Sequence, residues 1–280
     1  MYLSFPMKFE QHLEINTSGK TSVDVLEQST ELTRYAIKQA MTKGAVWLTR
    51  NKSTQRVRRA DKSLKPGDEL HLYFDQNILE AKPQSATLLA DEGTYSIWYK
   101  PYGMLCQGSK WGDHCTINRW AEKHLEPQRP AFIVHRLDRA ATGLIIIAHQ
   151  KKSAAYFSNL FQNRTIEKKY QAIVEGNVGG ELELNADIEN KPAFSHVKPV
   201  DYNPATQQSL VEVTIGTGRK HQIRRHLSGA GFPIVGDRFY GQGHESPSDL
   251  CLASCYLSFI SPVDDKEKSY TLPEHLKLTL

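Results

Sequence analysis

"HRLDRAATGLIIIA" (residues 135–148) joins a charged loop to a strongly apolar segment. Asp138 lies between Arg136 and Arg139, and residues 144–148 have the length and composition of a buried strand. An ion pair is the ordinary reason for such an arrangement. A carboxylate held among cations for chemistry on a polyanion is the alternative, and the residues around this stretch help to distinguish the two.

Short strands and occasional helices surround this stretch without a regular βαβ rhythm. Such a pattern favours an α+β fold with a mixed, largely antiparallel sheet and flanking helices. Apolar spacing and alternation predict the individual elements. The expected strands are 94–100, 131–135, 144–148, 168–176, 209–215 and 250–259, and the expected helices are 153–164 and 219–227.

A second, smaller α+β domain is predicted before residue 82. Residues 22–49 show helical spacing and then an extended segment, with Gly44 as the helix stop. A Pro-Gly-Asp turn then leads into the alternating strand "ELHLYF" (69–74). Residues 75–93 are polar and mixed, which predicts a linker. We therefore expect a small domain at 1–82, with its core at 22–74, and a larger domain at 90–280.

Positive charge is concentrated in the small domain, although the net charge of the 280 residues is only +4. Eight basic residues and one acidic residue occur between Lys43 and Lys65, with Trp47 close by. A solvated face is one explanation of this run. A surface that binds RNA phosphates is the other, and it would use Arg56, Arg58 and Arg59.

Composition excludes several other classes of protein. The longest apolar runs are strand-sized, so no membrane span and no membrane partner are expected. The first residues lack a basic region followed by an apolar one, so we expect a cytoplasmic protein. The four cysteines form no C-x-x-C pair, which favours free thiols, with a structural zinc site as the alternative.

Three further segments of the larger domain interleave basic and aromatic residues. They are "RTIEKKY" (164–170), "GTGRKHQIRRH" (216–226) and "GDRFYG" (236–241), the last with Arg238, Phe239 and Tyr240 on a turn. Such combinations suit a base turned out of its stack together with its flanking phosphates. An RNA substrate is therefore favoured over a simple ion pair at Asp138.

Five segments of the larger domain, in this order, form a recognisable set: "YKPYGM" (99–104), "HRLDRAATGLIIIA" (135–148), "FQNRTIEKKYQAIVEG" (161–176), "GTGRKHQIRRHL" (216–227) and "PIVGDRFYG" (233–241). Through them, residues 94–260 resemble the RluA-type RNA pseudouridine synthase family. The segments "LTRYAIKQAMTKGAV" (32–46) and "LKPGDEL" (64–70) carry a weaker resemblance of residues 22–74 to the small RNA-binding domain of the ribosomal-protein-S-four type.

This resemblance implies that a uridine in structured ribosomal or transfer RNA is isomerised to pseudouridine, without a cofactor or a metal. It implies that Asp138 is the catalytic aspartate, that Tyr170 stacks on the turned-out base, and that Arg224 pairs with the aspartate. We expect a monomer. The expected RNA contacts are Arg136, Arg139, Lys169, Arg219, Lys220 and Arg225, together with Arg56, Arg58 and Arg59 of the small domain.

Two other functions compete with this one. A glycoside hydrolase would need a second carboxylate across the bond, and only Asp138 lies in a recognisable motif. A non-catalytic RNA-binding protein would be favoured by loss of Asp138 or Tyr170, and both are present. His135 is expected to make a structural hydrogen bond, and His221 a helix-end or phosphate contact. Whether Asp138 attacks the base or the sugar stays open.

Overall fold

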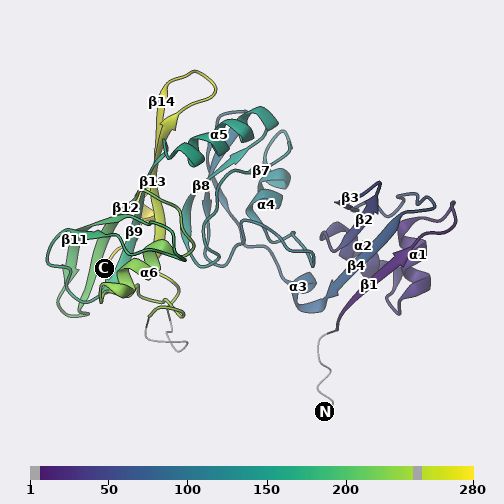
Figure 1. The fold of residues 1–280 in the computed structure, drawn as a ribbon, viewed down its shortest axis with the longest axis horizontal. Coiled ribbons are helices and arrows are strands. Elements are labelled where there is room, and N and C mark those ends of the chain that lie inside the picture. Colours follow the sequence, from purple (N-terminus) through teal and green to yellow (C-terminus); the bar gives the residue numbers. More distant parts are fainter. Residues whose placement is uncertain (1–6, 242–247) are drawn as a thin grey trace, which may run out of the picture. The chain divides into compact units, whose positions relative to one another are not determined.

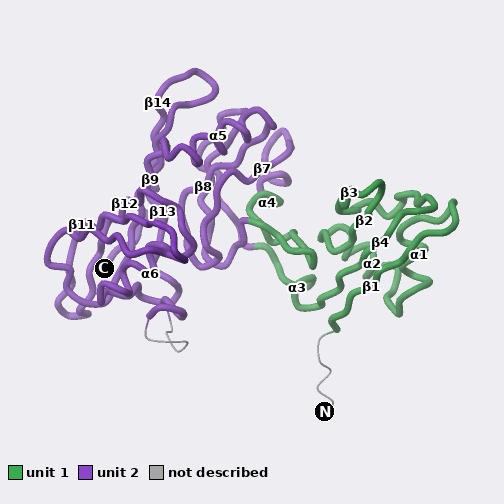
Figure 2. Tube along the Cα trace, in the orientation of Figure 1, with its two compact units in different colours: residues 1–83, 107–120 green, residues 84–106, 121–280 purple. Residues whose placement is uncertain are grey.

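The computed structural model describes residues 7–241 and 248–280 and divides the chain into two compact units (Figure 2). Unit 1 comprises residues 1–83 and 107–120, and unit 2 comprises residues 84–106 and 121–280. The segment 107–120 lies within the range that the sequence assigned to the larger domain, yet it packs with unit 1. Its backbone and side chains are therefore described with that unit.

Within the described residues, unit 1 holds a four-stranded sheet in the order β1-β4-β2-β3, and every pair of neighbours is antiparallel. Leu26 and Ile37 on its helices are fully buried with Leu70 and Leu72 of the sheet. The elements are β1 (Lys8–Glu14), α1 (Ser22–Ser29), α2 (Arg34–Thr42), β2 (Val46–Arg50), β3 (Ser53–Arg56), β4 (Glu69–Asp75) and α3 (Gln76–Glu80).

Local sequence signals set the boundaries of these elements. Thr21 and Asp24 form a capping box at α1, and the Thr33 side chain accepts a backbone hydrogen bond at the start of α2. The expected helical segment is therefore two helices, because Thr33 begins a second one. Gly44 follows α2 with a φ of +85°, a conformation that glycine adopts without strain, as the sequence predicted.

The predicted linker at residues 75–93 was wrong. The Asp75 carboxylate accepts a hydrogen bond from the Ile78 backbone N–H at 3.2 Å and so starts α3. Farther along, residues Thr87–Asp91 form β5 and pair antiparallel with the next strand. A polar composition concealed both elements, because a helix cap and an edge strand tolerate polar residues.

Unit 2 holds, within the described residues, a ten-stranded mixed sheet. Its main path runs β10-β11-β12-β9-β13-β8-β6-β5, while β14 pairs with β13 and β7 with β8. The elements are β5 (Thr87–Asp91), β6 (Tyr95–Lys100), α4 (Ile117–His124, beginning in unit 1), β7 (Phe132–Ile133), β8 (Thr142–Ala148), α5 (Lys151–Asn163), β9 (Glu167–Glu175), β10 (Leu182–Leu184), β11 (Ser195–Asn203), β12 (Gln208–Ile215), α6 (Gln222–Gly229), β13 (Leu252–Ile260), β14 (Glu267–Thr271) and the 3-10 helix Glu274–Leu276.

The centre of this sheet is the apolar strand that follows Asp138. Residues 143–148 of β8 are buried, and β8 pairs in parallel with β13 (Figure 1). On its other side β8 pairs antiparallel with β6. Phe157 of α5 packs against this region in the main core cluster of the unit. The predicted α+β class with a mixed, largely antiparallel sheet is confirmed. The loop that carries Asp138 thus leads directly into the most buried strand of the unit.

Gly143 in β8 offers a direct test of how closely β8 and β13 pack. Its φ is +105°, and a Cβ at this position would lie 2.2 Å from the backbone oxygen of Ser254. We expect Gly143→Ala to lower the free energy of unfolding by about 2–5 kcal/mol, because left-handed strain and overpacking add. Urea denaturation measures this loss. Gly179→Ala is the control, since its Cβ would meet nothing within 4 Å, and equal losses in both variants would contradict the argument.

Candidate active site

A cavity of about 330 Å³ in unit 2 brings together residues from three separate elements. Asp138 lies on the loop between β7 and β8, Tyr170 on β9 and Arg224 on α6, and all three line the cavity. Its volume lies within the usual range for a small-molecule site, roughly 300–1,000 Å³. The cavity can therefore take a group the size of a nucleotide.

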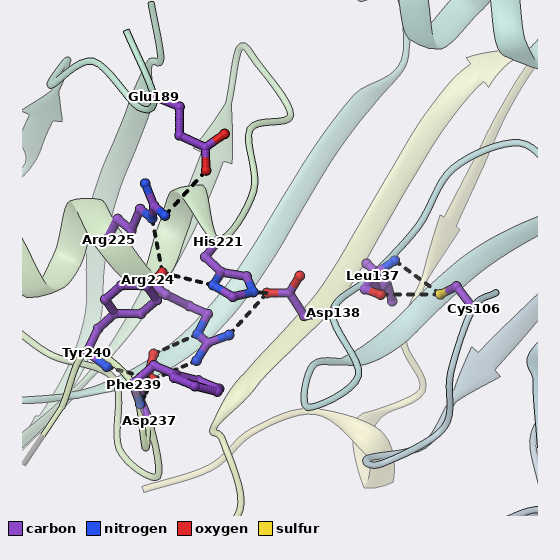
Figure 3. A network of polar contacts seen from close by, with 10 residues as sticks. All are labelled: Cys106, Leu137, Asp138, Glu189, His221, Arg224, Arg225, Asp237, Phe239 and Tyr240. Atoms are coloured by element: carbon purple, nitrogen blue, oxygen red, sulfur yellow. Dashed lines mark hydrogen bonds and ion pairs between the residues drawn. The ribbon is translucent and has the colours of Figure 1, made fainter. Parts of the chain in front are cut away.

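The guanidinium of Arg224 joins two carboxylates at this site (Figure 3). Its Nε and Nη2 each donate to Asp237 at 2.7 Å, and its Nη1 donates to Asp138 Oδ2 at 3.4 Å. The side chain is only 4% exposed. Burial alone would lower the pKa of Arg224, but the bonds to Asp237 and the charge of Asp138 raise it. Asp138 therefore faces a permanent cation.

Asp237 is the site residue that the sequence reasoning missed. Its carboxylate also accepts hydrogen bonds from the backbone N–H groups of Phe239 at 2.9 Å and Tyr240 at 3.1 Å. Burial would raise the pKa of Asp237, but the hydrogen bonds from Arg224 and from this turn lower it. The available signal was the aspartate that follows the first glycine of "GDRFYG", since such a residue commonly accepts the free N–H groups of a turn.

Residues of the "YKPYGM" segment and its neighbour hold the loop around Asp138. The ammonium of Lys100 is buried and donates to three backbone carbonyls, including that of Arg139 at 3.3 Å. Burial lowers the pKa of Lys100 to about 8, while Cys106 and Asp138 oppose this shift. The Cys106 thiol contacts both the N–H and the carbonyl of Leu137 at 3.3 Å. The backbone on both sides of Asp138 is therefore anchored.

Tyr170 and Lys169 are neighbours in β9, so their side chains point to opposite faces of the sheet. Tyr170 lines the cavity, and burial, followed by the charges of Asp138 and Cys255, raises the pKa of its phenol. Its hydroxyl is therefore protonated at neutral pH. Lys169 lies outside the cavity's described lining and pairs with Glu212 at 3.4 Å, so the structure does not bring it to this site.

The remaining expected RNA contacts of unit 2 divide into two groups. Arg136, Arg219 and Lys220 line the cavity, where their positive charge favours a phosphate-bearing ligand. Arg139 and Arg225 lie outside its described lining. Arg139 donates to a backbone carbonyl at 3.2 Å, and Arg225 donates to a tyrosine hydroxyl at 3.0 Å. The cavity is thus cationic around the single carboxylate of its described lining.

Gln222 shapes the glycine-containing loop beside the cavity. Its side-chain oxygen accepts hydrogen bonds from the Thr217 hydroxyl at 2.6 Å and from the Arg219 N–H at 3.1 Å. Its amide donates to the Phe194 carbonyl at 2.8 Å and to the Ser195 hydroxyl at 3.1 Å. One buried side chain therefore ties the loop to β11 and fixes the direction in which α6 begins.

His135 makes the structural hydrogen bond that the sequence predicted. Its Nε2 accepts from the backbone N–H of Ile146 at 2.9 Å, and its ring stacks on Phe161 with centroids 4.4 Å apart. Burial lowers the pKa of His135 to about 3, with a smaller contribution from the charge of Lys168. The imidazole is therefore neutral, and it joins the Asp138 loop to the buried strand β8.

Two of the three expected RNA contacts of unit 1 form hydrogen bonds or ion pairs with residues of that unit that are distant in sequence. Arg56 donates to two backbone carbonyls, at 2.8 and 2.6 Å, and its guanidinium lies 4.1 Å from the centroid of the Trp47 ring. Arg58 forms an ion pair with Asp113, whose side chain is 8% exposed. Arg59 is 83% exposed and, among the residues that the structure describes, pairs with the exposed Asp61 alone. Arg59 is therefore the most accessible of the three.

No three histidine, cysteine, aspartate or glutamate side chains converge on a possible metal position within residues 7–241 and 248–280. All four cysteines have free thiols. None of the helices in the described ranges is long and apolar enough to cross a membrane.

Known proteins are similar to this chain in sequence and in fold. A family model described as "RNA pseudouridylate synthase" matches residues 94–229. The "Dual-specificity RNA pseudouridine synthase RluA" of Vibrio vulnificus is 32% identical over 196 residues, which cover 62% of this chain and 77% of that protein. The chain belongs to the RluA-type RNA pseudouridine synthase family. Family members are isomerases that convert uridine to pseudouridine in RNA, and this chain is an enzyme of that class.

Two further comparisons define what this pseudouridine synthase shares with its relatives. The "Ribosomal large subunit pseudouridine synthase D" of Zymomonas mobilis is 27% identical over 52% of this chain, and the match spans only 54% of that protein. The solved structure "Human RNA Pseudouridylate Synthase Domain Containing 1" has a TM-score of 0.59 and 21% identity, and covers 69% of this chain and 86% of that one. This structural likeness concerns the fold.

Proposed function

We propose that this pseudouridine synthase modifies specific uridines in structured ribosomal or transfer RNA, with Asp138 as the catalytic carboxylate. The observation that carries this proposal is the convergence of Asp138, Tyr170 and Arg224 at one cationic cavity. The name of the Z. mobilis relative, which refers to the large ribosomal subunit, favours ribosomal RNA among the possible substrates.

The reaction breaks the bond between C1′ of the ribose and N1 of uracil, and forms a bond between C1′ and C5. The hydrogen leaves C5, and N1 of the product carries one, so the overall composition is unchanged. The Asp138 carboxylate acts as nucleophile or stabilises positive charge on the sugar. The Arg224 cation faces this carboxylate and holds its orientation. Tyr170, with its protonated phenol, stacks on the base and retains the detached uracil.

The charges of the cavity support binding of the turned-out nucleotide. Arg136, Arg219 and Lys220 line it and can hold the phosphates on either side of the target uridine. Unstacking a nucleotide costs a few kcal/mol, which these phosphate contacts offset. The same cations would gain little from a neutral carbohydrate, which argues against the glycoside hydrolase alternative.

The proposed activity is tested by mapping pseudouridines in total RNA from cells with and without this gene. We expect specific sites to return to uridine when the gene is deleted, and the purified protein to convert them again in the isolated RNA. The nucleoside mass must stay unchanged. Release of free uracil would instead identify a hydrolase, and tight RNA binding without any conversion would identify a non-catalytic binding protein.

We further propose that unit 1 binds RNA as a domain of the ribosomal-protein-S-four type. A second cavity, of about 490 Å³, lies in this unit and is lined by Arg59 and Lys62 together with Arg50, Arg56 and Arg58. Arg50, Arg56 and Arg58 are engaged by Asp68 or Asp113, so they shape the surface and contribute less net charge. Arg59 and Lys62 are the exposed cations that we assign to phosphates.

Replacing Arg59 and Lys62 together by alanine is expected to weaken RNA binding and flatten its salt dependence. Each lost phosphate contact lowers the slope of log affinity against log salt by about 0.7–0.9, so the pair lowers it by about 1.4–1.8. Filter binding at several salt concentrations measures the slope. Arg58→Ala is the comparison, because it leaves the Asp113 carboxylate without this partner and acts mainly on stability. An unchanged slope in the double variant would remove this surface from RNA binding.

The same proposal includes a monomer that acts in the cytoplasm. The free thiols of the four cysteines suit a reducing compartment. Binding energy from unit 1 would then hold a target uridine near the cavity of unit 2 without requiring a second copy of the chain.

A further inference from the structure

His221 lies at the cavity in an unusual conformation that the chemistry above does not use. It precedes α6 with a φ of +54°, in the left-handed region that non-glycine residues adopt infrequently. The residues that precede α1, α2 and α3 each use a side chain to cap the helix, whereas His221, like Gln150 before α5, makes no capping bond. A backbone conformation of this kind often marks a functional position.

The hydrogen-bond partners of His221 determine where its proton lies (Figure 3). The Tyr240 hydroxyl is 3.0 Å from His221 Nδ1 and 3.0 Å from Arg225 Nε. Arginine can only donate, so the Tyr240 oxygen accepts from Arg225 and can give its own proton to Nδ1. We assign the tautomer from these partners, and it places the ring proton of a neutral His221 on Nε2.

The surroundings of His221 favour this neutral form. Burial lowers its pKa, and although Asp138 opposes this, the charges of Arg224, Lys220 and Arg225 lower it further. The positive groups come from α6 and the loop before it, and the negative group comes from the loop between β7 and β8. The ring therefore donates through Nε2 toward Asp138 and accepts at Nδ1 from Tyr240.

His221 and Arg224 approach the same oxygen of Asp138. His221 Nε2 lies 3.8 Å from Oδ2, and Arg224 Nη1 lies 3.4 Å from it. Within the described part of the chain, both of these contacts lead to Oδ2 and neither to Oδ1. A separation of 3.8 Å is too long for a direct hydrogen bond, but such contacts commonly shorten when substrate occupies a site.

We propose that His221 is a positioning residue for Asp138, holding Oδ2 through its Nε2–H so that Oδ1 faces the nucleotide. Tyr240 and Arg225 orient the imidazole for this task. The χ2 torsion of an aspartate, which rotates its carboxylate, has a broad distribution of angles. A second donor to one oxygen therefore restricts which of the two oxygens faces the nucleotide. This inference rests on the proposed role of Asp138.

A pair of variants separates positioning from RNA binding. His221→Leu removes the donor, whereas His221→Gln keeps an N–H of similar reach and tolerates the backbone conformation about as well as leucine. With tritiated RNA from cells that lack the gene, we expect His221→Leu to lower the single-turnover rate about 10- to 100-fold at saturating enzyme, and His221→Gln to recover most of that loss. The Kd for the RNA should be unchanged in both. His196→Leu, on β11, is the matched control.

A third variant covers the case in which His221→Leu folds poorly. Tyr240→Phe removes the hydroxyl that orients the ring, and we expect it to slow the single-turnover step about 3- to 10-fold with an unchanged Kd. In the His221→Gln background the same change should have little effect, because no imidazole remains to be oriented. Equal effects of Tyr240→Phe in both backgrounds would overturn the proposed link between Tyr240 and His221.

Other outcomes overturn the role of His221 itself. A weaker Kd with an unchanged rate would make His221 a phosphate contact. Equal losses in His221→Leu and His221→Gln would mean that the imidazole transfers a proton. Asp138→Asn, assayed in parallel, tests the proposed catalytic role of Asp138 separately from the positioning role of His221. If it is inactive while His221→Leu is fully active, only the positioning role fails, whereas an active Asp138→Asn contradicts the proposed function.

Discussion

Asp138→Asn is expected to abolish turnover while it leaves folding and RNA affinity nearly intact. Asparagine keeps the shape of the side chain but removes the negative charge that attacks or stabilises the reacting nucleotide. Loss of a covalent catalyst commonly costs several powers of ten in rate, about 10⁴- to 10⁶-fold. Release of tritium from C5-labelled uridine measures the rate, and filter binding measures the affinity.

The surroundings of Asp138 make this variant interpretable. Its side chain is 25% exposed, and Lys100 and Cys106 hold the flanking backbone without using the carboxylate. The substitution therefore removes a charge without removing a support of the loop, and the melting temperature should change little. If the variant retained more than about a tenth of the activity, a loss below 1.4 kcal/mol, Asp138 would not be the catalytic carboxylate.

Arg224→Lys is expected to lower the rate about 10²- to 10³-fold, with little change in RNA affinity. Two nitrogens of the guanidinium donate hydrogen bonds to Asp237, and the third donates to Asp138. A lysine ammonium is a single point donor and cannot reproduce this planar fork. The Asp138 carboxylate would then lose its fixed orientation, although the positive charge remains nearby.

The stability of Arg224→Lys must be measured together with its rate. Leaving buried Asp237 without a full partner costs up to about 3–5 kcal/mol, so the variant is assayed well below its melting temperature. The rate at saturating RNA and the Kd are then compared with those of Lys220→Ala, a cavity-lining cation with an exposed side chain. An equal loss of affinity in the two variants, with the rate preserved, would make Arg224 a phosphate contact.

Several features of this protein were readable from local sequence alone. Alternation in "SLVEVTI" predicted β12, and the apolar run after Asp138 predicted β8, because strand periodicity records which side chains are buried. The positive-φ glycine at position 44 ended a helix as expected. The residues carried over from the family resemblance, Asp138, Tyr170 and Arg224, lie together at one cavity.

Local sequence did not show which partner a polar side chain takes within the fold. Arg56 and Arg58 remain predicted RNA contacts, and the structure adds that unit 1 engages both with its own carbonyls and with Asp113, 55 residues beyond Arg58. The polar segment 75–93 was expected to be a linker, but it forms α3 and β5. For the two arginines, contacts distant in sequence decide the partner. For the polar segment, α3 begins at the local cap from Asp75 and β5 forms by pairing with β6.

The amino-acid sequence by itself determined the family and the fold class and predicted Asp138 as the catalytic carboxylate, because these depend on residue types at fixed local spacing. The tertiary structure alone decided how that carboxylate is held. Arg224 lies 86 residues from Asp138 in sequence, and Asp237 lies 13 residues beyond Arg224. An arginine has more donors than any one neighbour can use, and charge alone does not specify which acceptors it serves. That choice follows from the packing that excludes water and brings the three side chains within reach.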